Sequence, residues 1–237
     1  AGMMLSPAAL AQAGDAFGDH PVCVGPFKFK DRVPQTSISV ERDPLYYDAG
    51  AVHLDTITYR IMTDANIRAA NLRSGDVQVA DTISPQDVDA LVQEQGLGIL
   101  QIGSLGYQAM TVNIGNVDGT GEPPGDPGTP LAREADIRRA LSMSIDREAL
   151  VNTVFNSWYE PACSPVSPSS PYASELSEDC VDYDPEAARA LLESTGAQVP
   201  FPITMQVSNS PDTLRYAQAL QAAVSEGGFD LTIRPVE

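Results

Sequence analysis

The sequence predicts a mixed α/β fold, because helix-like and strand-like segments alternate along its 237 residues. Alternation with a period of two, typical of strands, occurs at Ser37–Arg42 and over residues 56–62. Several other segments begin with a capping residue before proline and end at glycine, which is the pattern of a helix. From residue 203 to 234, strand, helix and strand follow one another, which we interpret as a right-handed parallel unit.

Six helices are expected. In three of them a side-chain oxygen able to accept an orphan backbone N–H stands directly before a proline, and a glycine able to adopt the left-handed conformation follows the helix. The starting pairs are Ser84-Pro85, Asp184-Pro185 and Ser210-Pro211, and the glycines are Gly96, Gly196 and the pair Gly227-Gly228. The predicted helices cover residues 85–92, 186–194, 212–226, 66–73, 135–144 and 147–155, the last capped by Asp146.

Shorter strands are predicted from alternating or β-branched residues over 77–80, 99–102, 109–114, 203–207 and 231–234. Residues 115–130 are rich in glycine and proline and predict an exposed loop. This loop is not a nucleotide-binding loop, because it lacks a Gly-Lys-Ser/Thr ending and acidic residues follow it.

Composition restricts the class of partner. Hydrophobic residues make up 43% of the chain, enough for a core, and no stretch approaches the roughly 18 apolar residues of a membrane helix. The formal charge of -18 would repel a phosphate backbone, so we expect no nucleic-acid partner. The acidity either keeps the surface solvated or favours cationic ligands.

Cysteine placement predicts a disulfide. Cys163 and Cys180 bracket a segment rich in proline and serine that we expect not to form a helix, and a bridge there would stabilise the fold by about 3 kcal/mol. Such a bridge favours an oxidising compartment. Cys23 is left either as a buried free thiol or with a partner outside this chain, and none of the cysteines has zinc-site spacing.

Four blocks of sequence resemble one known family. They are Val24-Gly25-Pro26-Phe27-Lys28-Phe29, Glu41-Arg42-Asp43-Pro44-Leu45-Tyr46-Tyr47, Asn71-Leu72-Arg73-Ser74-Gly75-Asp76-Val77, and Ile137-Arg138-Arg139-Ala140-Leu141 with Ser144-Ile145-Asp146-Arg147. Their order and spacing are similar to those of the peptide/nickel-binding family, family 5 of the solute-binding proteins. The chain departs from the family at Cys23-Val24, where Gly-Thr is frequent, and in its longer loop over residues 115–130.

The resemblance implies a periplasmic-binding-protein-like fold of type II, cluster C, with two partial lobes joined by crossing strands. Residues 1–108 would be part of the first lobe and residues 109–237 the first portion of the second, with the crossing near residues 106–110. Family members are about twice as long, so we expect a fragment that lacks its export leader and binds solute weakly by itself.

The resemblance also implies a function. The chain would belong to the substrate-binding component of an ABC importer, a monomeric extracytoplasmic protein or lipoprotein. It would capture a small solute, here expected to be an oligopeptide, and deliver it to permease subunits without catalysis or a cofactor.

Three pairs of residues are predicted to contact the ligand. Tyr107 and Gln108 lie at the expected crossing, although Tyr107 could equally be a core aromatic of a strand. Trp158 and Tyr159 follow a helix, where the tryptophan either stacks on ligand or anchors the loop. Ser208 and Asn209 end a strand before a helix N-terminus, where free N–H groups and the helix dipole favour a carboxylate, and Ser210 caps that helix.

Other classes of function have less support. The acidic residues 175, 178, 179, 182 and 184 lack the spacing of a calcium loop, and His20 and His53 stand alone, so no metal site is predicted. Residues 102–106 do not form a Gly-x-Ser-x-Gly elbow, so an extracellular hydrolase is a weak alternative. A chemosensory or scaffolding relative without a transport role is the other alternative.

Overall fold

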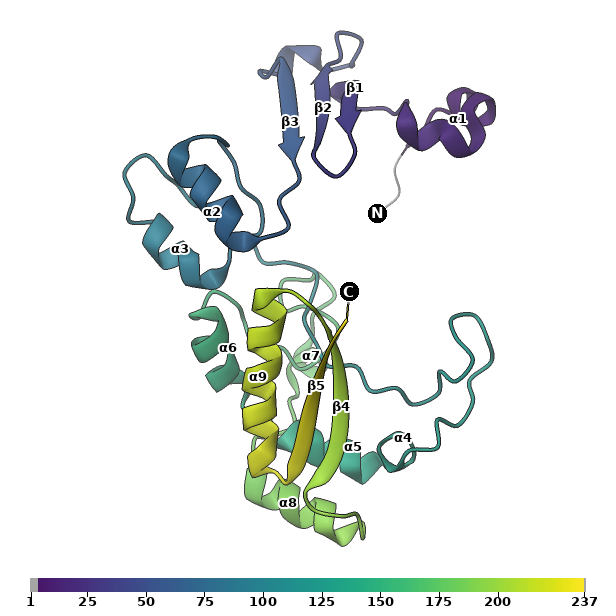
Figure 1. The fold of residues 1–237 in the computed structure, drawn as a ribbon, viewed down its shortest axis with the longest axis vertical. Helices are drawn as coiled ribbons and strands as arrows, with labels where there is room; N and C mark the ends of the chain where they lie inside the picture. The colour runs from purple at the N-terminus through teal and green to yellow at the C-terminus, as the bar shows by residue number, and fades with distance from the viewer. Residues whose placement is uncertain (1–3, 237) are drawn as a thin grey trace. The chain divides into compact units, whose positions relative to one another are not determined.

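The computed structural model describes residues 4–236, which form two compact units (Figure 1). The first unit ends at Ala80 and the second begins at Asp81. Both contain helices and strands, as the predicted mixed α/β class requires. The lobe boundary predicted at residue 108 concerns the longer protein and stays a prediction.

The first unit is built on a three-stranded antiparallel sheet of β1 (Phe27–Val33), β2 (Ser37–Arg42) and β3 (Thr56–Arg60), in that order. Val40 of the central strand pairs with Phe29 on one side and Ile57 on the other. The remaining elements are α1 (Pro7–Ala13), η1 (Gly14–Asp19), η2 (Ala49–Ala51) and α2 (Ala65–Ser74). Asp64 caps α2 by accepting from the backbone N–H of Asn66, and Gly75 ends it in the left-handed conformation.

The second unit contains a parallel pair of strands, β4 (Phe201–Ser208) and β5 (Phe229–Val236), connected by α9 (Pro211–Glu226). The pair is continuous from Phe201 opposite Phe229 to Ser208 opposite Val236, so the predicted strand–helix–strand unit is confirmed as parallel. Its other helices are α3 (Pro85–Leu91), α4 (Pro130–Arg133), α5 (Ala135–Met143), α6 (Arg147–Phe155), α7 (Glu175–Glu178) and α8 (Pro185–Ser194). Among residues 4–236, no helix is both long and apolar enough to cross a membrane.

The main core lies between α5, α6, α8, α9 and the strand pair. Ile137, Leu192, Leu220 and Phe229 are almost completely buried there, and each such side chain contributes about 1.5–3 kcal/mol to folding. Figure 1 shows α9 lying along the β4–β5 pair with α8 beneath its C-terminal end.

The described structure corrects three strand predictions. Residues 77–80, 99–102 and 109–114 form no strand in it. Leu100 and Ile102 are instead 95% and 89% exposed. Alternation of apolar and polar residues indicates β propensity, but a strand also needs a neighbouring strand to receive its hydrogen bonds. Conversely, the bulged β1 was not predicted from alternation.

Two local predictions are also wrong. Ser84 does not cap α3 with its side chain in the described structure; its hydroxyl instead lies against the Asp212 carboxylate and the Gln86 amide oxygen, to which it donates. The segment between Cys163 and Cys180 does contain one helix, the single turn α7. This turn begins with a capping box, in which Ser174 and Ser177 satisfy each other's backbone groups.

Candidate functional site

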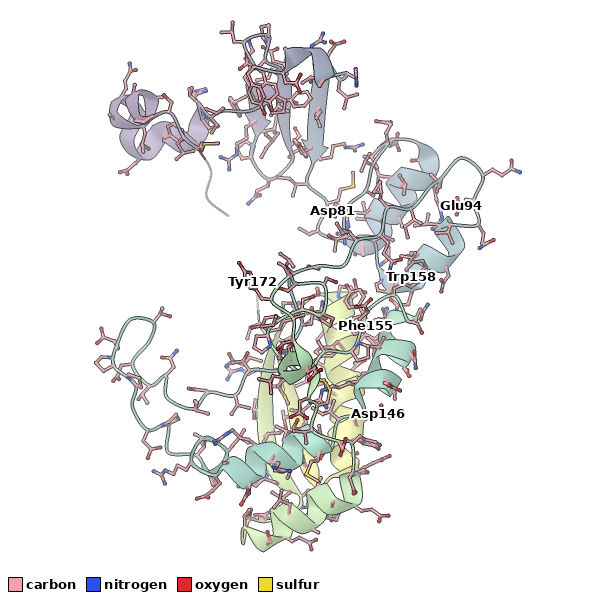
Figure 2. The ribbon with its side chains drawn as sticks, turned by 180° about the vertical axis from the view of Figure 1, so that it is seen from behind. Asp81, Glu94, Asp146, Phe155, Trp158 and Tyr172 are labelled. Atoms are coloured by element: carbon pink, nitrogen blue, oxygen red, sulfur yellow. A yellow bond between two sulfur atoms is a disulfide. The ribbon has the colours of Figure 1, made fainter. Side chains whose placement is uncertain are left out.

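Tyr159 lies on the exposed side of an aromatic cluster at the end of α6. Its ring stacks on Phe155, with centroids 4.3 Å apart and planes 5° from parallel. Phe155 in turn contacts Tyr216 of α9, with centroids 6.0 Å apart. Figure 2 shows Phe155 and Trp158 at the end of α6 opposite Asp146, whose carboxylate caps the start of the helix. Tyr159 keeps 40% of its surface exposed, so a solute could stack on it.

Trp158 is anchored by its indole. Its Nε1–H donates to Oδ1 of Asp89 at 2.9 Å, and the Asn156 amide donates to Oδ2 of the same carboxylate at 3.2 Å. Asp89 belongs to α3, so these bonds join the end of α6 to α3. Of the two roles considered for Trp158, the structure therefore displays the anchoring contact. Stacking of this half-buried ring on a ligand stays a prediction.

Ser208 and Asn209 lie exposed at the carboxyl end of β4, immediately before α9. The Ser208 hydroxyl donates to Oγ1 of Thr213 at 3.0 Å. Ser210 caps α9 as predicted, since its Oγ accepts from the Thr213 N–H. The positive end of a sixteen-residue helix is thus aligned with this turn.

The aromatic cluster and the Ser208–Asn209 turn share the N-terminal end of α9. Desolvation raises the pKa of the Tyr159 hydroxyl, and the nearby Asp212 carboxylate raises this pKa further. Asp212 belongs to the first turn of α9. Tyr159, Ser208 and Asn209 therefore gather at one end of the second unit. An aromatic surface beside polar groups is a suitable arrangement for binding a small solute.

Sequence reasoning missed the residues that support this end of the unit. Ser84 donates to Asp212 at 2.8 Å, Gln86 donates to the carbonyl of Val154, and Arg215 contacts both Gln86 and Asp212. These bonds join residues separated by up to 129 positions. Nothing local in the sequence pairs them, although Asp212 in a first helical turn is a common position for a carboxylate.

Tyr107 and Gln108 lie exposed in an irregular segment of the second unit. Tyr107 is 55% exposed, so the alternative of a buried core aromatic is wrong. Nearby, the Ser104 hydroxyl accepts from the Gly106 N–H at 2.9 Å, and the Ser104 carbonyl accepts from the Ser167 hydroxyl at 2.6 Å. A ligand-binding role for Tyr107 and Gln108 stays a prediction.

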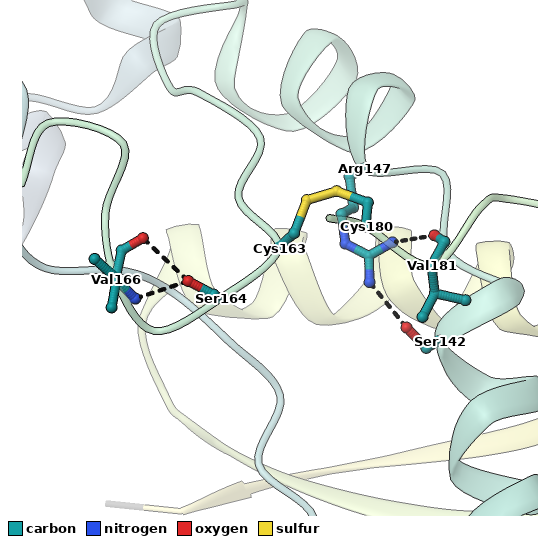
Figure 3. The surroundings of a disulfide bond; sticks show 7 residues. All are labelled: Ser142, Arg147, Cys163, Ser164, Val166, Cys180 and Val181. Atoms are coloured by element: carbon teal, nitrogen blue, oxygen red, sulfur yellow. Dashed lines mark hydrogen bonds between the residues drawn. A yellow bond between two sulfur atoms is a disulfide. The ribbon is translucent and has the colours of Figure 1, made fainter. Parts of the chain in front are cut away.

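Cys163 and Cys180 are joined in the structure, with their Cα atoms 4.9 Å apart (Figure 3). Beside the bridge, Arg147 donates to the Ser142 hydroxyl at 2.9 Å and to the Val181 carbonyl at 3.4 Å. Cys23 is free and exposed, so the alternative of a buried thiol is wrong.

A shallow cavity of about 390 Å³ lies next to Cys180. Polar groups dominate its lining, which includes Arg139, Asp179 and Asp182 but none of the six predicted ligand residues. Over the residues that the structure describes, no group of three or more His, Cys, Asp and Glu side chains is arranged to hold a metal ion.

Residues 3–237 match the family model of the bacterial extracellular solute-binding proteins, family 5, middle region. The chain belongs to this family. It is 29% identical over its whole length to the glutathione-binding protein GsiB of Pectobacterium atrosepticum, of which it spans 43%. This family 5 chain therefore covers less than half of a curated relative.

Two solved structures show that the family 5 chain has the predicted periplasmic-binding-protein fold. NikZ from Campylobacter jejuni, in complex with Ni(L-His), matches 99% of the chain with a TM-score of 0.76 at 21% identity. AppA from Bacillus subtilis, in complex with a nonapeptide, matches 98% with a TM-score of 0.73 at 22% identity. The chain covers 48% and 47% of these two proteins. The named relatives are binding proteins rather than enzymes, in agreement with the sequence analysis.

Proposed function

We propose that this chain forms part of the substrate-binding component of an ABC importer. The component captures a small solute outside the membrane and delivers it to permease subunits. The match of residues 3–237 to family 5 carries this proposal. An extracytoplasmic monomer, either free or anchored as a lipoprotein, is the form of the protein that we propose.

We further infer that the solute is a short peptide. The GsiB relative is named for binding glutathione, and AppA was solved with a nonapeptide. In this chain, Tyr159 offers an exposed ring and the Ser208–Asn209 turn offers polar groups at a helix N-terminus. A peptide has both apolar side chains and a carboxylate that suit these groups.

The test is a calorimetric titration of the protein at the length its gene encodes, with glutathione, a nonapeptide and nickel–histidine as probes. We expect one of the two peptide probes to bind with 1:1 stoichiometry and the metal complex not to bind. Tyr159→Ala should weaken this binding about tenfold or more, since it removes the stacking surface. Tyr172→Ala, which removes a tyrosine that is 85% exposed elsewhere in the unit, is the matched control and should bind as the parent does. Binding of nickel–histidine alone would overturn the peptide assignment, and hydrolysis of a peptide probe would overturn the transport role.

A further inference from the structure

The disulfide loop, defined as residues 163–180, holds the segment that precedes Tyr107. The Ser167 hydroxyl donates to the Ser104 carbonyl at 2.6 Å. Ser167 is only 7% exposed and is one of three buried polar residues in the described part of the chain. A hydrogen bond partly shielded from water is stronger than a fully exposed one, and its loss leaves the Ser104 carbonyl without that donor.

A second contact, between Gly103 and Ser169, packs the same two segments against each other. The Gly103 backbone approaches Ser169 so closely that a Cβ on Gly103 would overlap both side-chain atoms of Ser169. Only glycine fits at this approach. Gly103 and Ser104 are therefore packed against the disulfide loop by two neighbouring contacts, one steric and one polar.

Ser104 transmits this restraint toward Tyr107. Its carbonyl is held by Ser167, while its own hydroxyl accepts from the Gly106 N–H at 2.9 Å. Gly106 directly precedes Tyr107, and in the described structure residues 99–114 form no helix or strand. The conformation of the backbone before Tyr107 therefore depends on side-chain bonds rather than on a helix or a sheet.

The disulfide loop is itself fixed to the core of the unit. Its ends are joined by Cys163 and Cys180, and the following residue, Val181, accepts from Arg147 (Figure 3). Arg147 begins α6 and also donates to Ser142 of α5. These bonds thus fix the position of the disulfide loop, and with it Ser167, relative to the core helices α5 and α6.

We propose that Ser167 is a positioning residue, which acts through Ser104 to present Tyr107 to the solute. The disulfide loop is the support that keeps Ser167 in place. The presentation of Tyr107 to a solute rests on the proposed function, whereas the restraint on residues 104–107 does not.

The restraint is tested by hydrogen exchange on the protein at the length its gene encodes, without any ligand. Ser167→Ala should speed the exchange of the Gly106 amide, which donates to the Ser104 hydroxyl, about fivefold, as expected when the partly buried hydrogen bond that holds Ser104 is lost. Ser164→Ala is the matched control, because Ser164 lies in the same loop and its hydroxyl, among residues 4–236, bonds to Val166 alone. Equal exchange rates of the Gly106 amide in Ser167→Ala and in the parent would overturn the proposal.

The presentation of Tyr107 is tested by a double-mutant cycle, with a nonapeptide and glutathione as probes. Ser167→Ala should weaken peptide binding about three- to tenfold when Tyr107 is present and should change it little in a Tyr107→Ala background. A merely structural Ser167 would weaken binding equally in both backgrounds, and this result would overturn the proposal. If the parent binds neither probe, the proposed peptide function fails by itself, and the exchange comparison alone decides the restraint.

Discussion

At the scale of single residues, the core of the second unit contains a close contact between two small residues, Ser144 and Gly227. Ser144 is completely buried, and its hydroxyl donates to the Ala140 carbonyl at 2.8 Å. Gly227 approaches so closely that a Cβ there would overlap both side-chain atoms of Ser144. The φ angle of Gly227 is -76°, which any residue can adopt, so the requirement for glycine is steric.

Gly227→Ala should therefore lower the free energy of unfolding by about 1–3 kcal/mol, the usual cost of an extra carbon in a packed core. Urea unfolding followed by circular dichroism measures the change. Gly98→Ala is the matched control, because a Cβ on Gly98 meets nothing within 4 Å. Equal destabilisation by the two substitutions would show that the close contact with Ser144 does not govern residue 227.

Tyr216 makes the stability of the same core sensitive to pH in the alkaline range. Burial raises the pKa of its hydroxyl above the ordinary value of 10.0, while Arg147 opposes the shift. The folded state thus holds the proton more tightly than the unfolded state does. This stabilisation is complete below pH 10 and is lost as pH rises through the folded-state pKa.

When pH is raised from 7 to 11, the free energy of unfolding of Tyr216→Phe should consequently fall by less than that of the parent. Urea unfolding at both pH values measures the difference. Tyr172→Phe, in which the altered ring is 85% exposed, should lose as much stability as the parent. A loss in Tyr216→Phe that matches the parent would contradict the assigned role of Tyr216.

At the scale of elements, the connection between α6 and α8 is mostly irregular, and the disulfide restrains its conformation. It contains one helical turn, α7, and several hydrogen bonds within a few residues of each other. A covalent tie that closes such a loop stabilises the fold mainly by restricting the unfolded chain.

Replacing both Cys163 and Cys180 with serine should lower the free energy of unfolding by about 3 kcal/mol, given their sequence separation of 17. Chemical denaturation with and without reductant measures this effect, and reductant should destabilise only the parent. Cys23→Ser, which alters a free and exposed thiol, should leave stability unchanged. Insensitivity of the parent to reductant would mean that the bridge does not form.

Helices and strands differed in how well the sequence predicted them. The helices at α2, α5, α6, α8 and α9 were found within two residues of their limits, because caps such as Asp184 and Ser210 act on the N–H groups two or three residues away. Strands over 77–80, 99–102 and 109–114 were wrong, because their formation depends on partners far along the chain.

The candidate site was predictable only in part. Exposure of Tyr107, Tyr159, Ser208 and Asn209 agrees with a ligand-facing position, since each lies in a loop or at the end of an element. The bond from Trp158 to Asp89 spans 69 positions and the bond from Ser167 to Ser104 spans 63, so spacing could not reveal them. These long-range bonds are the part of the site that required coordinates.

At the scale of the whole molecule, family membership and charge point in the same direction. The formal charge of -18 disfavours a nucleic-acid partner, and the chain belongs to a family of extracellular solute-binding proteins. The chain spans 43% of the GsiB relative.

Native mass spectrometry of the protein at the length its gene encodes, purified from its own host, tests the central claim most directly. We predict a species heavier than the polypeptide by the mass of one short peptide, and we predict that denaturation releases this peptide intact. A preparation that carries no small molecule, takes up no added peptide and converts added peptide to smaller products would contradict the account.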